Sequence, residues 1–327
     1  MINRLIWLET DNTYPYRNLA MEEYMTNHVP DGTCILFLWQ NRHTVVIGRN
    51  QNCWKECSVD FLEEEGGYLV RRLSGGGAVF HDLGNLNFTF IVRKTDYDVE
   101  RQLQVILEAV RRLGIQAEKT GRNDITVEGR KFSGNAFYQT GDCCYHHGTL
   151  LVHADKENMS RYLNVPREKL ASKGVSSVKS RVANLDEFCP GLTVDRVKAA
   201  LAEAFSQVYG QVAEKMEEKE LPEDAIGPLT EKFESWQWKY GRKIPFEHEM
   251  EQRFAWGGIQ MQFHVDGGRI QEVNVFSDAM DQELIGNLSE RLKGCPYDGN
   301  AMCEAVKEAG TEGGIRQDIL SLIKESM

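Results

Sequence analysis

Hydrophobic residues repeat along this chain with two periods, which separate predicted strands from predicted helices. Apolar stripes at helical spacing predict helices over residues 98–113 and 193–209. Asp98 and Thr193 are good N-caps for these helices, and a glycine follows each predicted end. A further helix is predicted at 17–28. Short runs of β-branched and aromatic residues predict strands at 1–9, 33–39, 44–48, 68–70 and 88–92.

The pattern changes near Pro245. Residues 259–265 and 270–276 alternate on either side of a turn at 266–268, which predicts a hairpin with one buried face. Helical patterns follow near 280–293, 299–309 and 314–326. We therefore predict a large domain at 1–245 and a small α+β domain at 246–327. The acidic stretch at 214–224 is predicted to be a solvated connection.

Charge and composition narrow the possible partners and compartments. The chain has 327 residues, a net charge of -11 and a pI near 5.3. This acidity argues against general nucleic-acid binding, which requires a basic surface. No apolar stretch is long enough for a membrane span, and the N-terminus lacks a signal-peptide pattern. The eight cysteines form no CxxC pair, so we expect reduced thiols in the cytoplasm and no zinc site.

A glycine-rich loop joins the predicted strands at 68–70 and 88–92. Gly75, Gly76 and Gly77 follow one another, shortly after Arg71 and Arg72. Consecutive glycines let a ligand approach the main chain, and bare N–H groups beside arginines favour a phosphate or carboxylate. The GxxxxGK[ST] and GxGxxG patterns are absent, so the anion would bind between strands. The alternative is a simple glycine-rich turn, although a turn needs no arginine pair.

Residues 121–136 predict a second informative feature, a hairpin that turns at Glu128-Gly129. Lys131 follows the turn, whereas Asn123 and Asp124 precede the outgoing strand. The hairpin can therefore bring an ammonium near a carboxamide and a carboxylate. Asn and Asp are suitable oxygen ligands for Mg²⁺ that is held mainly by phosphates. The alternative for Lys131 is a solvated lysine on a hairpin.

Two other stretches carry possible chemistry. The basic, serine-rich residues 167–181 could close over a nucleotide or steer an acidic partner, or could be a solvated loop. Cys143 and Cys144 precede adjacent histidines, so a Cys–His nucleophile is conceivable, although two ordinary thiols are the simpler interpretation. His146 and His147 should point to opposite faces of a strand, which makes them poor ligands for one metal.

These motifs resemble, in order and interval, the bacterial lipoate–protein ligase A family. The resemblance covers nearly the whole chain, including the C-terminal part. Its segments are RRLSGGGAVFHD at 71–82, GRND at 121–124, KFSGNA at 131–136, HHGTLL at 146–151 and SSVKSRVANL at 176–185.

The resemblance implies an α+β fold with a large mixed β-sheet flanked by helices, as in biotin and lipoyl ligases, and a small accessory domain. It also implies a cytoplasmic enzyme, expected to be a monomer, that uses MgATP. Lipoate would become lipoyl-AMP with release of pyrophosphate, and its analogue octanoate would form the corresponding octanoyl-AMP. The lipoyl group would then pass to a lysine of an acceptor, such as a 2-oxoacid dehydrogenase E2 subunit or the glycine-cleavage H protein.

The resemblance also assigns roles to residues. Lys131 matches the family's lysine motif and would act in catalysis, between the two anions that react. Asp124, with Asn123, would take Mg²⁺. No residue stands out as the general base of the transfer step. ATP and lipoyl-AMP would be held by Arg71, Gly76, Gly77, Ala78, Val79 and Lys131, and lipoate by Arg71, Gly75, Gly76 and Lys131.

Two alternatives from other functional classes stay open. A cysteine-dependent octanoyl or lipoyl transferase of the same fold would use Cys143 or Cys144 without ATP. A lipoate-binding sensor would keep the site but lack turnover. Related transferases generally lack the accessory domain, which favours the ligase.

Overall fold

The computed structural model describes residues 1–120, 124–164, 181–241, 244–309 and 314–327. In this part of the chain, no helix is both long and apolar enough to cross a membrane. The chain divides into two compact units, which we describe separately. The first unit consists of Met1–Val46, Lys55–Val70 and Val79–Ser235, and the second of Ile47–Trp54, Arg71–Ala78 and Trp236–Met327. The glycine-rich loop therefore groups with the C-terminal residues.

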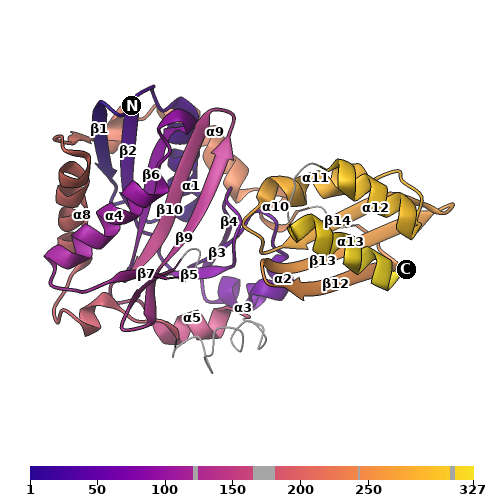
Figure 1. The fold of residues 1–327 in the computed structure, drawn as a ribbon. Coiled ribbons are helices and arrows are strands. Elements are labelled where there is room, and N and C mark those ends of the chain that lie inside the picture. The colour runs from indigo at the N-terminus through magenta and orange to yellow at the C-terminus, as the bar shows by residue number, and fades with distance from the viewer. Residues whose placement is uncertain (121–123, 165–180, 242–243, 310–313) are drawn as a thin grey trace. The chain divides into compact units, whose positions relative to one another are not determined.

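A mixed eight-stranded sheet forms the centre of the first unit, with strand order β11-β1-β2-β6-β10-β9-β8-β7 (Figure 1). β1 runs parallel to both of its neighbours, and the other strands pair antiparallel. The strands are β1 (Arg4–Glu9), β2 (Thr33–Trp39), β6 (Asn85–Arg93), β7 (Glu118–Thr120), β8 (Asp124–Val127), β9 (Arg130–Thr140), β10 (Cys143–Leu151) and β11 (Glu214–Met216). The predicted mixed sheet is confirmed.

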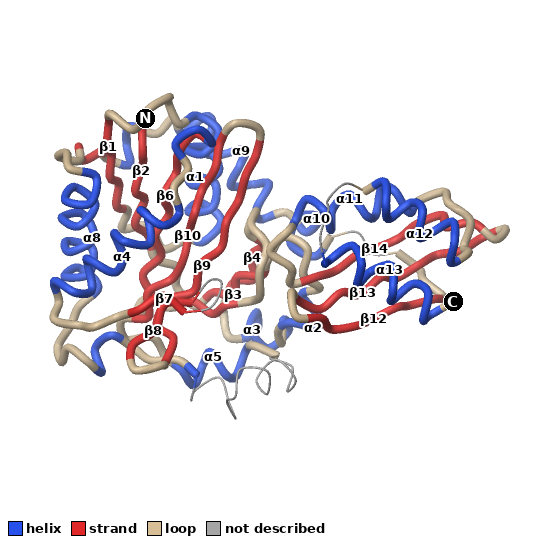
Figure 2. The backbone as a smooth tube through the Cα atoms, in the orientation of Figure 1, coloured by secondary structure: helices blue, strands red, loops and turns tan. Residues whose placement is uncertain are grey.

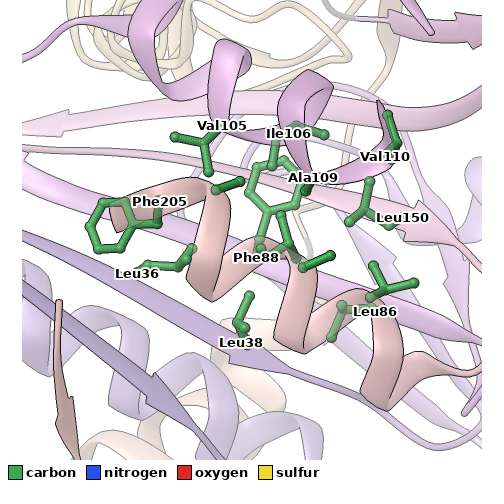
Figure 3. Packing of buried hydrophobic residues seen from close by; sticks show 14 of the residues in the cluster. Leu36, Leu38, Leu86, Phe88, Val105, Ile106, Ala109, Val110, Leu150 and Phe205 are labelled. Carbon is green, nitrogen blue, oxygen red and sulfur yellow. The ribbon is translucent and has the colours of Figure 1, made fainter. Parts of the chain in front are cut away.

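Helices α4 (Val99–Arg112) and α8 (Val194–Tyr209) cover one face of this sheet. Asp98 caps α4 by accepting the N–H of Arg101, and Thr193 caps α8 in the same way. Both helices match their predicted ranges closely. Figure 3 shows their side chains packed with those of β2, β6 and β10, which forms the main core. Labelled members are Leu36, Leu38, Leu86, Phe88, Val105, Ile106, Ala109, Val110, Leu150 and Phe205.

Helix α1 (Pro15–His28) lies on the opposite face, where Glu22 meets side chains of β6 and β10. Three short strands, β3 (Thr44–Ile47), β4 (Tyr68–Arg71) and β5 (Val79–His81), form a small sheet in the order β4-β3-β5. These strands belong to the first unit except for their end residues Ile47 and Arg71. The other described helices of this unit are α3 (Val59–Glu64), α5 (Lys156–Tyr162) and α9 (Glu223–Glu234), and α2 (Cys53–Glu56) is divided between the two units.

The acidic stretch at 214–224 is exposed or half-exposed throughout and connects α8 to α9, as predicted, but it also contains ordered structure that was not predicted. It begins with β11, which pairs with β1 at the edge of the large sheet. Its acids form ion pairs: Glu214 with Arg4 at 2.8 Å, and Glu218 with Arg17 at 3.2 Å. The sequence did not predict these contacts, because the partners of these acids lie about two hundred positions earlier in the sequence, as the pairing of Arg4 with Glu214 shows.

The second unit contains an antiparallel sheet in the order β12-β13-β14 with its own apolar core. Figure 2 shows these strands with the three C-terminal helices beside them. The predicted alternating hairpin corresponds to β13 and β14. The elements are α10 (Trp236–Tyr240), β12 (His248–Phe254), β13 (Gly257–Asp266), β14 (Arg269–Ser277), α11 (Gln282–Leu292), α12 (Gly299–Glu308) and α13 (Gly314–Ser326). The α+β fold class is thus confirmed for both units.

Candidate functional site

The β8–β9 hairpin carries Lys131 and Asp124, as the sequence predicted. Glu128 and Gly129 occupy its turn, both with positive φ angles of 50° and 73°. Two positive φ angles in sequence are typical of the tight turns that suit twisted hairpins. The strand register shifts once, so that Lys131 pairs with Thr126 while Ser133 pairs with Ile125. This bulge leaves one extra residue in β9, and bulges commonly redirect the side chains beside them.

Lys131, Asp124 and Arg181 form a charged cluster on this hairpin. The Nζ of Lys131 lies 2.6 Å from Oδ1 of Asp124, and a guanidinium nitrogen of Arg181 lies 3.0 Å from Oδ2. Burial raises the pKa of the Asp124 carboxyl, but the two cations more than offset this and lower it below its ordinary value. The carboxylate is therefore charged at neutral pH, and it holds the Lys131 ammonium in place.

The backbone fixes this cluster as well. The Lys131 carbonyl accepts the N–H of Ala183 at 2.9 Å, and Lys131 forms a parallel bridge with Val182. The segment that contains Arg181 is therefore bound to β9 by main-chain contacts. Sequence reasoning missed Arg181 as a partner of Asp124, because 57 positions separate the two residues and no local pattern connects them.

A row of buried polar side chains occupies one face of β6, opposite the core face. Asn85, Asn87 and Thr89 alternate with Leu86 and the phenylalanines of the core, and both asparagines are almost completely buried. The Nδ2 of Asn85 donates to Oδ1 of Asn87 at 3.0 Å. Among the described residues, Oδ1 of Asn85 and Nδ2 of Asn87 have no hydrogen-bond partner. Buried amide groups are rarely left unsatisfied, so this row is a candidate ligand-binding surface.

This row extends to the β8–β9 hairpin through β10. Thr149 of β10 lies opposite Asn87 in the sheet, and its Oγ1 accepts the N–H of Gly134 at 3.3 Å. Gly134 in turn lies opposite Asp124. Lys131 and the two asparagines therefore belong to strands of one sheet that are separated only by β10. The sequence carried a signal that we did not use, namely the period-two placement of Asn85, Asn87 and Thr89 within an apolar strand.

A second polar network continues the same face toward α1. Glu22 is 1% exposed, and its Oε1 accepts a hydrogen bond from Thr89 at 2.7 Å. The Nδ1 of His147 lies 2.8 Å from the same oxygen, and the indole of Trp39 donates to Thr89 at 3.1 Å. Sequence reasoning placed Glu22 on a helix but did not predict its burial, which depends on the packing of α1 against the sheet.

The two adjacent histidines point to opposite faces, as predicted. His146 lies on the core side, with its ring nitrogens 2.8 Å from Oδ1 of Asn135 and 3.2 Å from Oε1 of Gln102. Burial, and to a smaller extent His147 and Lys119, lower the pKa of His146 to about 3. His146 is therefore neutral and structural. In the described part of the chain, no three His, Cys, Asp or Glu side chains gather as a metal site.

The glycine loop, in the second unit, packs closely against other backbone segments. Gly76 has φ +89°, and its N–H donates to the carbonyl of Ala279 at 3.2 Å. A Cβ added to Gly75 would lie 2.4 Å from that carbonyl oxygen. These close approaches explain why glycine is needed here. Gly77 and Ala78 are half-buried, as is Val79, which begins β5 of the first unit.

The two arginines of this loop bind backbone carbonyls. Arg71 donates to the carbonyls of Gly48, Arg49 and Gln51 and to those of Trp238 and Lys239, at distances of 2.7–3.2 Å. Arg72 donates to Oγ of Ser74 and to the carbonyls of Gly75 and Gly77. Both side chains thus fix the shape of the loop. Ligand binding by Arg71 and by the loop backbone stays a prediction.

Some of the predicted site residues lie outside the residues that the structure describes, and the two predicted cysteines are buried. Asn123 and most of the basic stretch 167–181 lie outside the described residues. Cys143 and Cys144 are buried, and burial raises the pKa of the Cys144 thiol despite nearby Lys94. A high pKa disfavours the thiolate that a nucleophile requires.

Two surface cavities lie away from Lys131. The first, of about 650 Å³, is lined by residues of α4 and α8, and the second, of about 430 Å³, is lined by residues around Trp7 and Lys198.

Solved structures of several proteins are similar to this chain. LipL1 of P. falciparum, solved in complex with lipoate, is 28% identical, with a TM-score of 0.84 over 97% of this chain and 99% of that one. A bi-partite lipoate protein ligase of Thermoplasma acidophilum, analysed with its E2 lipoyl domain, is 31% identical, with a TM-score of 0.64 over 75% and 99%. A lipoate-protein ligase A bound with ATP is 28% identical, with a TM-score of 0.63 over 74% and 99%.

Family models cover both parts of the sequence. Residues 14–206 match the lipoyl protein ligase A/B catalytic domain, and residues 243–323 match the bacterial lipoate protein ligase C-terminus. The first match alone spans more than half of the chain. Together with the mixed sheet and the accessory unit, these matches establish that the chain belongs to the lipoate–protein ligase family of enzymes.

Proposed function

We propose that the protein is an ATP-dependent ligase that activates lipoate and transfers the lipoyl group to a lysine of an acceptor protein. The observation that carries this proposal is the Lys131–Asp124 pair on the same sheet as the buried, unsatisfied amides of Asn85 and Asn87. A fixed cation and the Nδ2 donor of Asn87, which has no partner among the described residues, suit an activated acyl nucleotide, which is anionic and rich in acceptors. The lipoate-bound and ATP-bound relatives support the same choice of substrates.

The first step joins two anions. A carboxylate oxygen of lipoate attacks the α-phosphorus of ATP, the bond to the β-phosphate breaks, and pyrophosphate leaves with the electron pair. Lys131 would reduce the repulsion between the carboxylate and the phosphate and stabilise charge that develops on the phosphate. Arg71 and the backbone of residues 75–79 would hold the nucleotide and the lipoyl carbonyl, as the family resemblance implies.

The charged cluster on the β8–β9 hairpin offers one protein ligand for Mg²⁺, the carboxylate of Asp124. The Asp124 carboxylate is ionised and sits beside Lys131, so it could supply one protein oxygen to an ion held mainly by phosphates. Both of its oxygens are engaged by Lys131 and Arg181, so such binding would require Asp124 to release one of them. When bound, the ion would neutralise phosphate charge. Asn123 stays a proposed second ligand.

In the second step, the neutral amine of the acceptor lysine attacks the carbonyl carbon of lipoyl-AMP, the bond from that carbon to the phosphate oxygen breaks, AMP leaves, and the amine nitrogen releases a proton to water. Lys131 would also stabilise the departing AMP. We propose E2 lipoyl domains as acceptors, because a relative was analysed with its E2 lipoyl domain, and also the glycine-cleavage H protein, which the family resemblance implies. The proposal further assigns catalysis to residues 1–245 and an accessory role to 246–327, in a cytoplasmic monomer with access to ATP.

Lipoate-dependent exchange between ATP and labelled pyrophosphate tests this proposal. We expect exchange with lipoate and octanoate but not with biotin, when the three acids are compared under the same conditions with Mg²⁺. Absence of exchange with folded, Mg²⁺-supplied protein would refute ATP-dependent activation, and lipoate binding without exchange would favour a sensor.

The cysteine-dependent transferase is the second candidate, and the burial of Cys143 and Cys144 weighs against it. Replacing both cysteines by serine should leave lipoate-dependent exchange close to that of the parent protein. A transferase would instead lose all activity, and the parent protein would form a thioester from an octanoyl carrier protein without ATP.

A further inference from the structure

Gly134 lies directly beneath the Lys131 ammonium. A Cβ built on Gly134 would lie 2.8 Å from Nζ and 3.0 Å from Cε of Lys131, and the next nearest atom is Oγ1 of Thr149 at 3.9 Å. Distances below 3.0 Å are closer than carbon atoms tolerate without movement. The lysine side chain therefore crosses the space that a larger residue would fill.

The backbone of Gly134 gives no other reason for a glycine. It is absent from the residues of positive φ among the described glycines, so an L-residue could adopt its conformation. Glycine in the middle of a strand weakens the strand, because it adds chain entropy and contributes no side-chain packing. A glycine at this position therefore calls for a local explanation, and the close approach of Lys131 provides it.

Asp124 explains why the lysine takes this path. Asp124 lies opposite Gly134 in the β8–β9 register, and its Oδ1 is 2.6 Å from Nζ of Lys131. The bulge that follows Lys131 shifts the register by one residue. The ammonium thus passes over Gly134 to reach the carboxylate across the hairpin.

We propose that Gly134 is a positioning residue, whose missing side chain places the Lys131 ammonium over β9 beside Asp124. Gly134 itself contacts no reacting atom and acts only through the lysine. The catalytic consequence rests on the proposed function, whereas the position of the ammonium can be measured without any reaction. In the KFSGNA motif at 131–136, Gly134 is therefore required because a larger side chain would collide with Lys131.

Gly134→Ala is the direct test. The new methyl group meets the far end of a flexible side chain, so we expect the variant to fold and the ammonium to move away from Asp124. Labelling of Lys131 by an amine reagent, quantified by peptide mass spectrometry, should rise several-fold. Lipoate-dependent exchange should fall roughly 100-fold, as expected for a displaced reacting group.

Gly227→Ala is the matched control in the same unit. Gly227 lies in α9, with no atom within 4 Å of an added Cβ and no positive φ. Both the labelling of Lys131 and the exchange rate should stay unchanged in this variant. Labelling of Lys131 in Gly134→Ala that equals the parent and the control would overturn the proposal.

A double variant distinguishes an effect of Gly134 on the position of Lys131 from an effect on the folded structure as a whole. If Gly134 acts only through Lys131, then Lys131→Ala/Gly134→Ala should lose no more exchange than Lys131→Ala alone. Should Gly134→Ala prevent folding, the double variant should fold, because truncating the lysine removes both close contacts. A further loss of exchange in the double variant, or its failure to fold, would contradict the proposal. If the parent protein shows no exchange, the labelling comparison still decides the positioning and only the proposed function fails.

Discussion

The two faces of β6 differ in a way that locates the site. Leu86, Phe88 and Phe90 point to the face that α4 and α8 cover, where side chains pack as an apolar core (Figure 3). Asn85 and Asn87 point to the other face, where buried amide atoms have no partner among the described residues. One face of the strand is therefore complete without a ligand, and the other is not.

The two faces of β6 should therefore contribute to different properties, the core face to the stability of the fold and the polar face to activity. Apolar burial stabilises the fold on the core face, whereas an unsatisfied buried amide lowers stability unless a ligand provides its partner. The polar face continues through Thr149 to the hairpin that carries Lys131. Substitutions on the core face should therefore reduce stability, and those on the polar face should reduce ligand binding and turnover.

Phe88→Ala should have the largest effect, and it should act on stability. Phe88 is completely buried and contacts the rings of Phe90 and His146 at centroid distances of 5.8 and 5.5 Å. Loss of such a ring typically lowers the free energy of unfolding by about 3–5 kcal/mol. Urea unfolding measures this value. A loss well below 1 kcal/mol would mean that this face is not the main core.

Lys131→Ala should have the next largest effect, and it should act on adenylation. Removing a focused charge from a site that stabilises a transition state typically costs about 3 kcal/mol, or more than 100-fold in rate. Lys131→Arg should fail as well, because a planar guanidinium does not replace a compact ammonium. Pyrophosphate exchange measures the rate, and urea unfolding should show little change. An unchanged rate in Lys131→Ala would assign the lysine a purely structural role.

Asn87→Ala should produce a smaller effect that appears in binding. The substitution removes an amide with one unsatisfied nitrogen, so the free energy of unfolding should change by less than in Phe88→Ala. Affinity for a non-hydrolysable lipoyl-AMP analogue should fall by about 10-fold, because a ligand acceptor would lose its donor. Calorimetric titration measures this affinity. Unchanged affinity together with a large loss of stability would place Asn87 with the core.

Asp124→Asn should produce the smallest effect, which depends on pH. The folded-state pKa of Asp124 lies below the ordinary value of 3.8, so the ionised form stabilises the fold above that value. This contribution is lost as the pH falls through the folded-state pKa. The parent protein should therefore be the more stable at pH 7, with the difference shrinking below pH 3.8. Urea unfolding across this range tests the sign, and a difference that grows in acid would contradict the assignment.

Local signals in the sequence predicted much of this fold. The caps at Asp98 and Thr193 and the apolar stripes between them and the following glycines determine α4 and α8, because capping and periodicity act within one helix. The turn at Glu128-Gly129 similarly placed Lys131 on the strand that returns alongside Asp124. The mixed sheet came from family resemblance, since strand order depends on contacts that are distant in sequence.

The remainder of the site required tertiary packing. Arg181 reaches Asp124 from 57 positions away, and Glu22 is buried only because α1 packs on the polar face. Asn85 and Asn87 could have been found from their alternation with Leu86 and Phe88. Their unsatisfied atoms, however, become visible only when every neighbouring donor and acceptor is placed.

A single-turnover experiment measures whether Lys131 accelerates formation of the adenylate. Excess protein is mixed with labelled lipoate and MgATP without an acceptor, quenched at short times, and analysed for enzyme-bound lipoyl-AMP. We expect the parent protein to accumulate the adenylate and Lys131→Ala, folded to the same extent, to form it more than about 100-fold more slowly. Formation of the adenylate at the parental rate by Lys131→Ala would contradict the role of the β8–β9 hairpin in this reaction.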